Sequence, residues 1–397
     1  MPSHPILSPF ALGRRQALTV LAGGAASTVL GGHHFNQAWA ASGSESNASG
    51  SSNMAIDLTG GLPVEREYFY GEKPGPEVRD AANVWLEEEN GAFAMRIGIE
   101  HVAEEWDTPE LWLDIAFPDG RVISGREYGA GGSPFDADGK PTIKRCGPLR
   151  YHCIEPFKHW KITFDPHAVR ELTAQQLIDQ AIPDEPPMRE TAFEIDYYPA
   201  VPPLISGTLT SASREAMSGE QGTFISPRYE QLCRAEGWLS LDGDRQDFSG
   251  QILRIKRQGV RKFEGFWGHC WMSALFPSGR GFGVNTFPPR DDGKPTFNEG
   301  FIFDGSGALI PARAVEIPWM ERLYASGEPI KLVLETADGR RETIEGETFI
   351  NCRSVTNNTV MPENWPIVQQ AHARYRWDDE EATGMIERST FAEKMKL

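Results

Sequence analysis

"WLDIAFPDGR" at residues 112–121 recurs as "WMSALFPSGR" at residues 271–280, with Trp, Phe, Pro, Gly and Arg at the same five positions. Downstream of each copy stands the pentapeptide DGKPT, at 138–142 and again at 292–296. Two blocks that match in the same order indicate an internal repeat. The chain is therefore expected to contain two related domains.

Each copy of the repeat predicts a strand, a tight turn and a second strand, because Pro-Asp-Gly and Pro-Ser-Gly are turn sequences between extended apolar runs. Polar turns separate further strand-like segments, and this spacing is typical of antiparallel barrels and sandwiches. We predict an all-β fold of two tandem antiparallel barrels. The additional predicted strands are 92–101, 159–165, 191–199, 250–258, 297–304, 330–338, 341–350 and 383–390.

Two segments, 167–182 and 229–238, have the apolar spacing of short helices and are expected to decorate the β-fold. Pro, Ser and Gly interrupt the strand pattern between residues 199 and 223. We therefore expect an N-terminal domain over 58–205 and a C-terminal domain over 206–397.

The first forty residues contain no acidic side chain. Arg14 and Arg15 precede a small apolar run, and alanines stand at positions 38 and 40. This pattern predicts an export signal of the twin-arginine type over 1–40, and thus a periplasmic or secreted protein. The apolar run is too short for stable membrane insertion. Residues 41–57 are expected to be a disordered Ser/Gly linker, and Met54 within them is an alternative start.

The chain has a net charge of −17, and the part after residue 40 lacks two arginines and so carries −19. An acidic protein repels phosphate backbones, so no nucleic-acid partner is expected. Five cysteines without a Cys-x-x-Cys pair, and histidines without ligand spacing, predict no metal site. One disulfide is compatible with export, but its pairing is not defined by the sequence, and neither is the oligomeric state.

A tryptophan and a histidine stand just before the second copy of the repeat and have no counterpart before the first copy. Strand alternation would place Trp267, His269 and Trp271 on one face, with Cys270 on the other. A partly desolvated imidazole between indoles suits a proton shuttle, and indole faces stabilise cations. We take His269 as the candidate catalytic residue, although an aromatic core strand is the alternative. The position equivalent to His269 in the first copy is Glu110.

Carboxylates near this strand are the candidate partners of the histidine. Glu264 precedes Trp267, and Glu387 lies on the last predicted strand. Both are candidate proton donors or orienting groups. The candidate substrate-binding residues are Trp267, Trp271 and Phe287.

Three motifs resemble the tandem lipocalin-like proteins related to carotenoid 1,2-hydratase, also called hydroxyneurosporene synthase. They are EPFKHWKITFD at 155–165, the W-x-H-x-W core at 267–271 and TGMIER at 383–388. The resemblance implies two lipocalin-like barrels. It also implies that His269 and Trp271 act in hydration of an isoprenoid double bond, with a nearby carboxylate. The aspartate that precedes the histidine in that family is Gly268 here.

These observations favour an exported enzyme that transforms a hydrophobic terpenoid, steroid or polyketide-like molecule by acid–base chemistry without a cofactor. Hydration, isomerisation and cyclisation all fit. One alternative is a non-catalytic periplasmic carrier of a hydrophobic ligand. Another is a carbohydrate-active β-sandwich with two carboxyl groups across a cleft.

Overall fold

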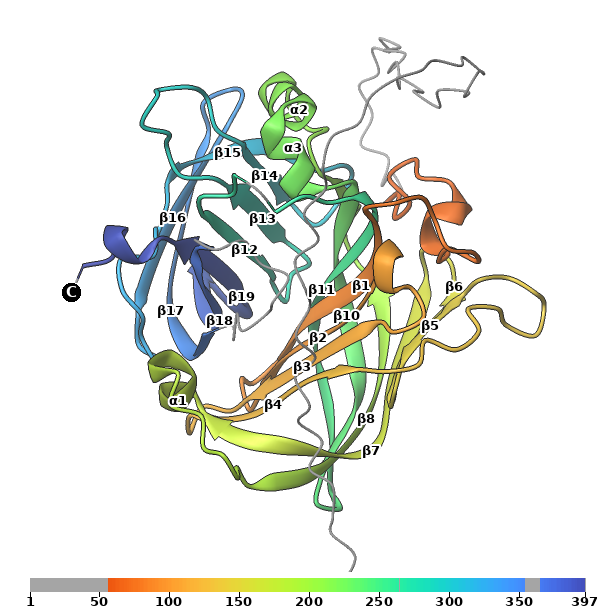
Figure 1. The fold of residues 1–397 in the computed structure, drawn as a ribbon. Helices are drawn as coiled ribbons and strands as arrows, with labels where there is room; N and C mark the ends of the chain where they lie inside the picture. The colour runs from red at the N-terminus through yellow and green to blue at the C-terminus, as the bar shows by residue number, and fades with distance from the viewer. Residues whose placement is uncertain (1–55, 264, 354–364, 397) are drawn as a thin grey trace, which may run out of the picture. The chain divides into compact units, whose positions relative to one another are not determined.

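The computed structural model describes residues 56–263, 265–353 and 365–396 of the chain. Strands make up most of the regular structure, which confirms the all-β prediction (Figure 1). The first sheet contains β1 (Val78–Glu88), β2 (Ala94–Val102), β3 (Glu110–Ala116), β4 (Arg121–Tyr128), β5 (Ile143–Cys146), β6 (Leu149–Glu155), β7 (His159–Thr173), β8 (Met188–Pro199), β9 (Leu204–Ile205), β10 (Arg228–Leu241) and β11 (Asp244–Val260).

The remaining strands form a closed barrel of eight. They are β12 (His269–Leu275), β13 (Gly281–Thr286), β14 (Asn298–Phe303), β15 (Ile310–Glu316), β16 (Pro329–Thr336), β17 (Arg341–Arg353), β18 (Ile367–Trp377) and β19 (Glu380–Thr390). Short helices decorate the strands: α1 (Ala174–Asp179), α2 (Ser211–Ser218), α3 (Glu220–Ile225), and the 3₁₀ turns Val64–Glu67, Ala103–Glu105 and Ala392–Lys394. No helix in the described ranges has both the length and the apolar content to cross a membrane.

The first sheet also closes on itself. Its strands pair in the order β1-β2-β3-β4 and β7-β8-β10-β11, and β11 returns to pair with β1. The gap between β4 and β7 is bridged by antiparallel pairing from Arg121↔Thr173 to Ser124↔Arg170. The other half of β7 pairs with β6, so the β5-β6 hairpin extends the sheet beyond the ring. The chain therefore has the tandem lipocalin-like barrels expected from its motifs, and the closed barrels exclude the two-sheet sandwich of the carbohydrate-active alternative.

The two rings close at different places relative to the repeat. The repeated stretch lies on β3, the third strand of the first ring, and on β12, the first strand of the second ring. β12 is flanked by β13 and β19, just as β3 is flanked by β4 and β2. Strands β18 and β19 thus occupy, at the end of the second ring, the places that β1 and β2 occupy at the start of the first.

This shift explains why the expected domain boundary at 205/206 differs from the observed architecture. β10 and β11 belong to the first ring, and the second ring begins only at β12. The repeat located equivalent strands correctly, but sequence similarity does not say where each ring closes. The loop after β9 and the first turn of α2 are held to the second barrel. Glu299 on β14 accepts hydrogen bonds from the backbone N–H groups of Gly207 and Leu209 and from the Ser213 hydroxyl.

Both predicted helices were largely wrong. Residues 229–238 lie within β10, and of 167–182 only α1 is helical, since 167–173 continue β7. β10 has apolar residues on both faces, because Cys233 and Ala235 face the first barrel's core while Leu232 packs against the second barrel. A strand buried on both faces loses its alternation, so its apolar spacing is easily mistaken for that of a helix.

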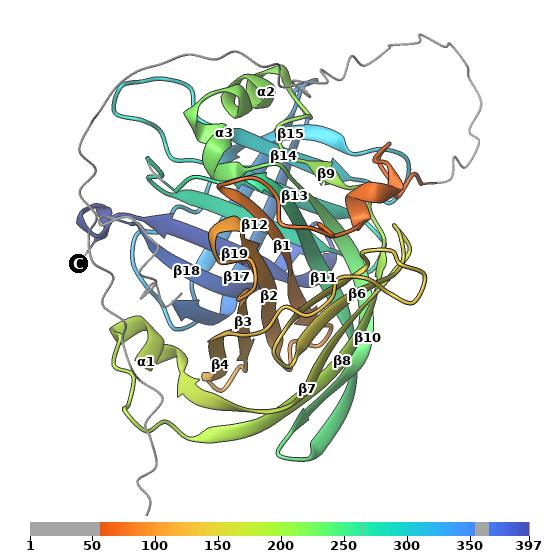
Figure 2. The same ribbon diagram turned by 45° about the vertical axis from the view of Figure 1, so that its right-hand side comes forward.

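Both barrels are filled with side chains. Leu111, Leu113 and Ile115 of β3 belong to the first core, and Cys270, Met272 and Ala274 of β12 belong to the second. The intervening residues of both strands consequently point outward. The outer faces of β1, β10 and β11 pack against those of β12, β14 and β19, strands whose course Figure 2 shows. The side chains on these faces form a third apolar cluster that includes Trp85, Leu232, Leu253, Trp271, Phe301 and Met385.

Candidate functional site

A pocket opens between the outer faces of the two barrels. Strands β1 to β4, β10 and β11 line it from the first ring, and β12, β13, β18 and β19 line it from the second. Its volume is about 170 Å³, measured over the positions that the centre of a water molecule can occupy. Since one water needs only about 10–15 Å³ on that measure, the space holds a small organic molecule or several waters.

The two copies of the repeat contribute matching positions to this pocket. Trp112 pairs with Arg126 on β4, and Trp271 pairs with Asn285 on β13. All four side chains line the pocket. The same correspondence relates Glu110 to His269 and Asn83 to Gln370, which also line it. The pocket is therefore formed by equivalent faces of two related barrels, with different side chains at most of the equivalent positions.

His269 is held at both ring nitrogens. Its Nε2 lies 3.1 Å from Oε1 of Glu387, and its Nδ1 lies 2.6 Å from the Ser389 hydroxyl. That hydroxyl also accepts the backbone N–H of His269 at 3.0 Å. Glu387 and Ser389 are alternate residues of β19, the strand paired with β12, so antiparallel register brings them beside the histidine. Two contacts fix the plane of the imidazole, as a proton-transfer group requires.

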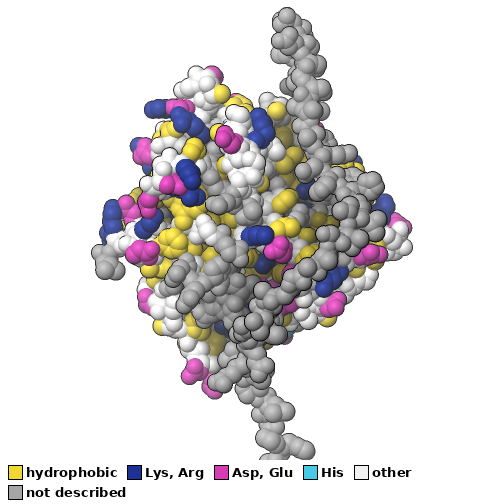
Figure 3. Space-filling model, turned by 45° about the horizontal axis from the view of Figure 1, so that its top comes forward, with side chains coloured by type: hydrophobic (Ala, Val, Ile, Leu, Met, Phe, Trp, Pro, Cys, Tyr) yellow, Lys and Arg dark blue, Asp and Glu magenta, His cyan; other side chains and the backbone are white. Residues whose placement is uncertain are grey.

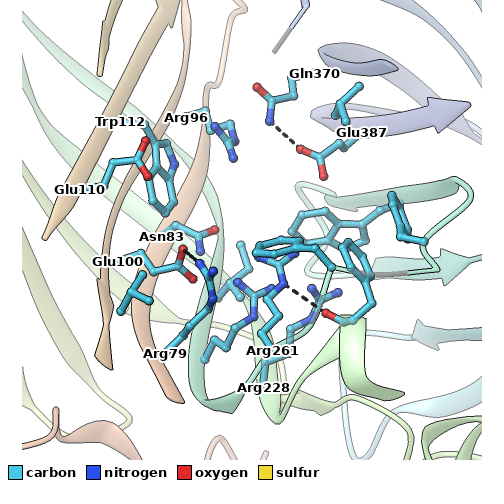
Figure 4. Close-up of a pocket in the computed structure, with 18 of the residues that line it drawn as sticks. Arg79, Asn83, Arg96, Glu100, Glu110, Trp112, Arg228, Arg261, Gln370 and Glu387 are labelled. Atoms are coloured by element: carbon cyan, nitrogen blue, oxygen red, sulfur yellow. Dashed lines mark hydrogen bonds and ion pairs between the residues drawn. The ribbon is translucent and has the colours of Figure 1, made fainter. Parts of the chain in front are cut away.

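Glu387 is held as a carboxylate. Burial alone would raise its pKa, but the hydrogen bond and charge of His269, the charge of Arg96 and a hydrogen bond from Gln370 together lower the pKa to about 2. The Gln370 amide donates to Oε2 at 2.7 Å, as Figure 4 shows. An ionised carboxylate therefore stands beside the imidazole at neutral pH.

Gly268 permits this arrangement. Its φ is 134°, and a Cβ at this position would lie 2.6 Å from the Ser389 carbonyl oxygen. The aspartate of the resembling family does not fit this backbone. Here the carboxylate next to the histidine comes instead from Glu387, across the strand pair.

Arg96 extends the site into the first barrel. Its guanidinium lies over the rings of Trp85 and Trp112, with its central carbon 5.5 and 5.3 Å from their centroids. Burial lowers the pKa of Arg96, and Glu387 counteracts this shift. The Trp112 ring lies directly over Gly98, where an added Cβ would be 2.2 Å from the indole. A side chain at 98 would thus displace one wall of the pocket.

Arginine is concentrated in this pocket. Six arginines and four glutamates line it, although the chain as a whole is acidic. On the described part of the face in Figure 3, basic and acidic side chains are instead interspersed. Figure 4 shows Arg79, Arg228 and Arg261 together on one side of the pocket, and Arg96, Gln370 and Glu387 on the other.

The structure brings together some of the predicted site residues. His269, Trp271 and Glu387 all line the pocket. Trp267 does not, because β12 begins only at His269 and the indole of Trp267 instead donates to the Pro288 carbonyl. Phe287 does not line the pocket either, but its ring packs against Phe266, which does. Glu264 lies outside the described residues. As expected, Cys270 faces the barrel interior, and burial raises the pKa of its thiol to about 12.

Sequence reasoning missed the half of the site that comes from the first barrel. Glu110 and Trp112 were within reach, because the repeat aligns them with His269 and Trp271. Burial and the neighbouring Glu100 raise the pKa of Glu110, while Arg126 opposes the shift. The arginines carried no comparable signal, since Arg79 and Arg257 stand in ordinary strand sequence.

The comparison with protein families covers both barrels. The model of the domain of unknown function DUF7064 matches residues 80–392. The chain belongs to the DUF7064 family. The matched region runs from β1 to the end of β19, so it includes both rings and every pocket residue named above except Arg79. No curated protein sequence matches this DUF7064 chain.

The chain is similar to solved structures at low sequence identity. A putative AttH from Nitrosomonas europaea is 11% identical, with a TM-score of 0.47 over 79% of this chain and 92% of that chain. Kievitone hydratase from Nectria haematococca is 11% identical, with a TM-score of 0.46 over 86% and 97%. CghA is 8% identical, with a TM-score of 0.44 over 87% and 98%.

Metal-binding side chains do not gather in the described part of this DUF7064 chain. No three His, Cys, Asp or Glu residues among the described ones are placed to hold an ion. The groups available at the pocket are an imidazole, carboxylates, guanidinium groups and indoles. They can move a proton, bind an anion and stabilise a cation.

Proposed function

We propose that this protein is an exported enzyme that transforms a hydrophobic small molecule by proton transfer, without a cofactor. The substrate class is terpenoid, steroid or polyketide-like, and the reaction is a hydration, an isomerisation or a cyclisation. The observation that carries the proposal is the contact between His269 Nε2 and Glu387 Oε1, 3.1 Å long and open to a hollow pocket. A structural histidine has no need of such a space.

The proposed chemistry needs one proton and returns it. His269 acts in its imidazolium form, with both ring nitrogens protonated, and gives the Nε2 proton to an alkene carbon of the substrate. The imidazole becomes neutral, and the substrate becomes a carbocation. The Glu387 carboxylate and the indoles of Trp112 and Trp271 stabilise that positive charge. Addition of water, loss of a different proton, or attack by a second double bond completes hydration, isomerisation or cyclisation. In each case the released proton returns to His269.

All three reactions leave a solvent proton on carbon, so one experiment tests them together. The protein is incubated in D₂O with hydrophobic extracts of the host cells, and products are followed by mass spectrometry. We expect deuterium in specific compounds with the wild type and none with His269→Asn. The matched control His167→Asn removes a half-exposed histidine that lies outside the pocket and should behave as the wild type.

A carrier that only binds its ligand is the second candidate, and the several arginine side chains in the pocket favour it. His269→Ala separates the two functions. An enzyme would keep its ligand affinity and lose turnover. A carrier would incorporate no deuterium even as the wild type.

Export is part of the proposal and rests on the sequence of residues 1–40, which lie outside the described residues. Replacing both Arg14 and Arg15 by Lys is expected to retain the protein inside the cell. Cell fractionation measures this, and periplasmic recovery of the variant would contradict a twin-arginine signal.

A further inference from the structure

One side of the pocket holds more positive than negative charge. Arg79, Arg228, Arg257 and Arg261 line it and form what we call the arginine cluster. Arg79 Nη1 is paired with Glu100 at 2.7 Å, and Arg228 Nη2 with Glu230 at 2.7 Å. Both pairs are almost completely buried. Two guanidinium groups are left without a carboxylate partner among the described residues.

Arg257 is the clearest case. It is only 5% exposed, and its Nε has no hydrogen-bond partner in the described part of the chain. Arg261 donates to the Phe224 carbonyl at 3.2 Å and lies over the rings of Phe224 and Phe263. A carbonyl and two rings supply partial charges only. An unpaired buried charge is costly, so such a guanidinium is expected to meet an anion in the functional state.

The electrostatics agree with this geometry. Burial lowers the pKa of Arg257, and the charges of Arg261, Arg228 and Arg79 lower it further, while the charge of Glu100 opposes the shift. The same like-charge crowding, with burial, lowers the pKa of Arg261 to about 10. Glu100 stays ionised because three arginines outweigh its burial. One more anion would relieve the repulsion among these groups.

The cluster is also within reach of the proposed reaction. Arg261 and Glu387 line the same pocket, so the two sides belong to one binding space. The rings of Trp85, Trp112 and Trp271 line the same pocket. A molecule that fills this space needs an apolar body and a negatively charged end.

We propose that the arginine cluster binds a carboxylate group of the substrate and thereby orients its apolar body toward His269 and Glu387. This rests on the proposed function for its mention of a substrate, but the binding itself does not depend on turnover. Planar guanidinium groups match a carboxylate with two parallel hydrogen bonds. The ligand class is therefore an amphiphilic carboxylic acid.

Two fluorescent probes with the same aromatic frame test the charge preference. 8-Anilinonaphthalene-1-sulfonate carries an anion, and N-phenyl-1-naphthylamine is its uncharged parent. We expect the wild type to bind the anion more tightly, and Arg257→Gln to reduce that preference at least about tenfold while leaving the neutral probe's Kd unchanged. Arg313→Gln, which removes an exposed arginine on β15, should alter neither Kd.

Competition identifies the anion. Decanoate should displace the probe at lower concentration than decan-1-ol in the wild type, and the two should become similar in Arg257→Gln and Arg261→Gln. A better competition by decyl phosphate than by decanoate would overturn the carboxylate assignment. Equal affinity for charged and neutral probes in the wild type, or a preference that persists in both variants, would overturn the cluster as an anion site.

The effect of Arg257→Gln on stability is measured separately from its effect on binding. Thermal unfolding without ligand should show Arg257→Gln to be at least as stable as the wild type, because an uncompensated buried charge is removed. An intact anion preference without deuterium incorporation would reject the enzyme and keep the binding site. Deuterium incorporation without an anion preference would keep the enzyme and reject the anion-binding site.

Discussion

Trp112 and Trp271 occupy the same position in two copies of one repeat, and both face a single pocket between the barrels. Neither contributes to the interior of its own barrel, because β3 and β12 turn their alternate residues Leu111 and Cys270 inward. Lipocalin-like barrels are usually considered as containers. Here side chains fill the interiors of both barrels, and the outer faces of the strands form the candidate site.

Replacing Glu387 by Gln is expected to lower the rate of deuterium incorporation by a factor on the order of 10²–10⁴, the usual contribution of a positioned acid–base group. The amide keeps the shape but removes the charge that faces His269. The rate of label uptake by mass spectrometry measures this. Glu345→Gln changes an exposed glutamate paired with Arg376 and serves as the control. Equal loss in both variants would mean a general charge effect.

Gly98→Ala is expected to lower the free energy of unfolding by about 1–3 kcal/mol, the usual cost of overpacking. The new methyl group would lie 2.2 Å from the Trp112 indole and force the ring away from β2. Urea unfolding measures the change. Gly75→Ala is a matched control, because a Cβ at 75 meets no atom within 4 Å. An unchanged midpoint for Gly98→Ala would show that Trp112 does not rest on β2.

His101 should make the protein sensitive to mild acid. Burial and the charge of Lys144 lower its pKa from 6.5 to about 3, although Asp80 opposes the shift. The unfolded state therefore binds one proton more than the folded state between pH 6.5 and 3. Stability is lost as pH falls through that range, at about 1.4 kcal/mol per pH unit from this residue.

The variant His101→Asn tests this assignment, because an amide oxygen can accept the Lys144 hydrogen bond that now reaches Nδ1 at 2.9 Å. We expect urea midpoints measured from pH 7 to pH 5 to fall less steeply in the variant than in the wild type. The same slope in both proteins would assign the acid sensitivity to other groups.

Four cysteines, at 146, 153, 233 and 270, are buried free thiols. Burial raises the pKa of Cys146 to about 11 and of Cys233 to about 12, and raises that of Cys153 still further. Alkylating reagents attack the thiolate, so none of the four should react with iodoacetamide in the native protein. Peptide mapping should find all four labelled in urea. Labelling of Cys270 under native conditions would contradict a filled second barrel.

Much of the fold was readable from the sequence for a definite reason. Alternating apolar residues and turn sequences depend on local geometry, so strands such as β2, β8 and β19 were located closely. β10 was missed because it is buried on both faces. Two barrels were predicted, but the strands at which each ring closes were missed, because closure depends on contacts between distant strands, such as Val78 with Val260, that leave no local mark.

Some residues of the candidate site could likewise be predicted from the sequence, and others could not. His269 and Glu387 were predicted because a resemblance named one and the last strand carried the other, and both line the pocket. Trp267 was misplaced because Gly268 turns the chain just before β12, so the alternation of a strand does not extend back to it. Arg79 and Arg257 were beyond sequence reasoning, since their role depends on which outer face meets the second barrel.

The late position of β19 has a consequence for biosynthesis. β12 leaves the ribosome about 110 residues before β19, the strand that pairs with it and supplies Glu387 and Ser389. During that interval the histidine has no partner, and the second barrel has an open edge. The first ring, by contrast, can close as soon as β11 has been made. Synthesis thus delays the pairing of His269 with Glu387 until the first ring, which forms the other wall of the pocket, has been made.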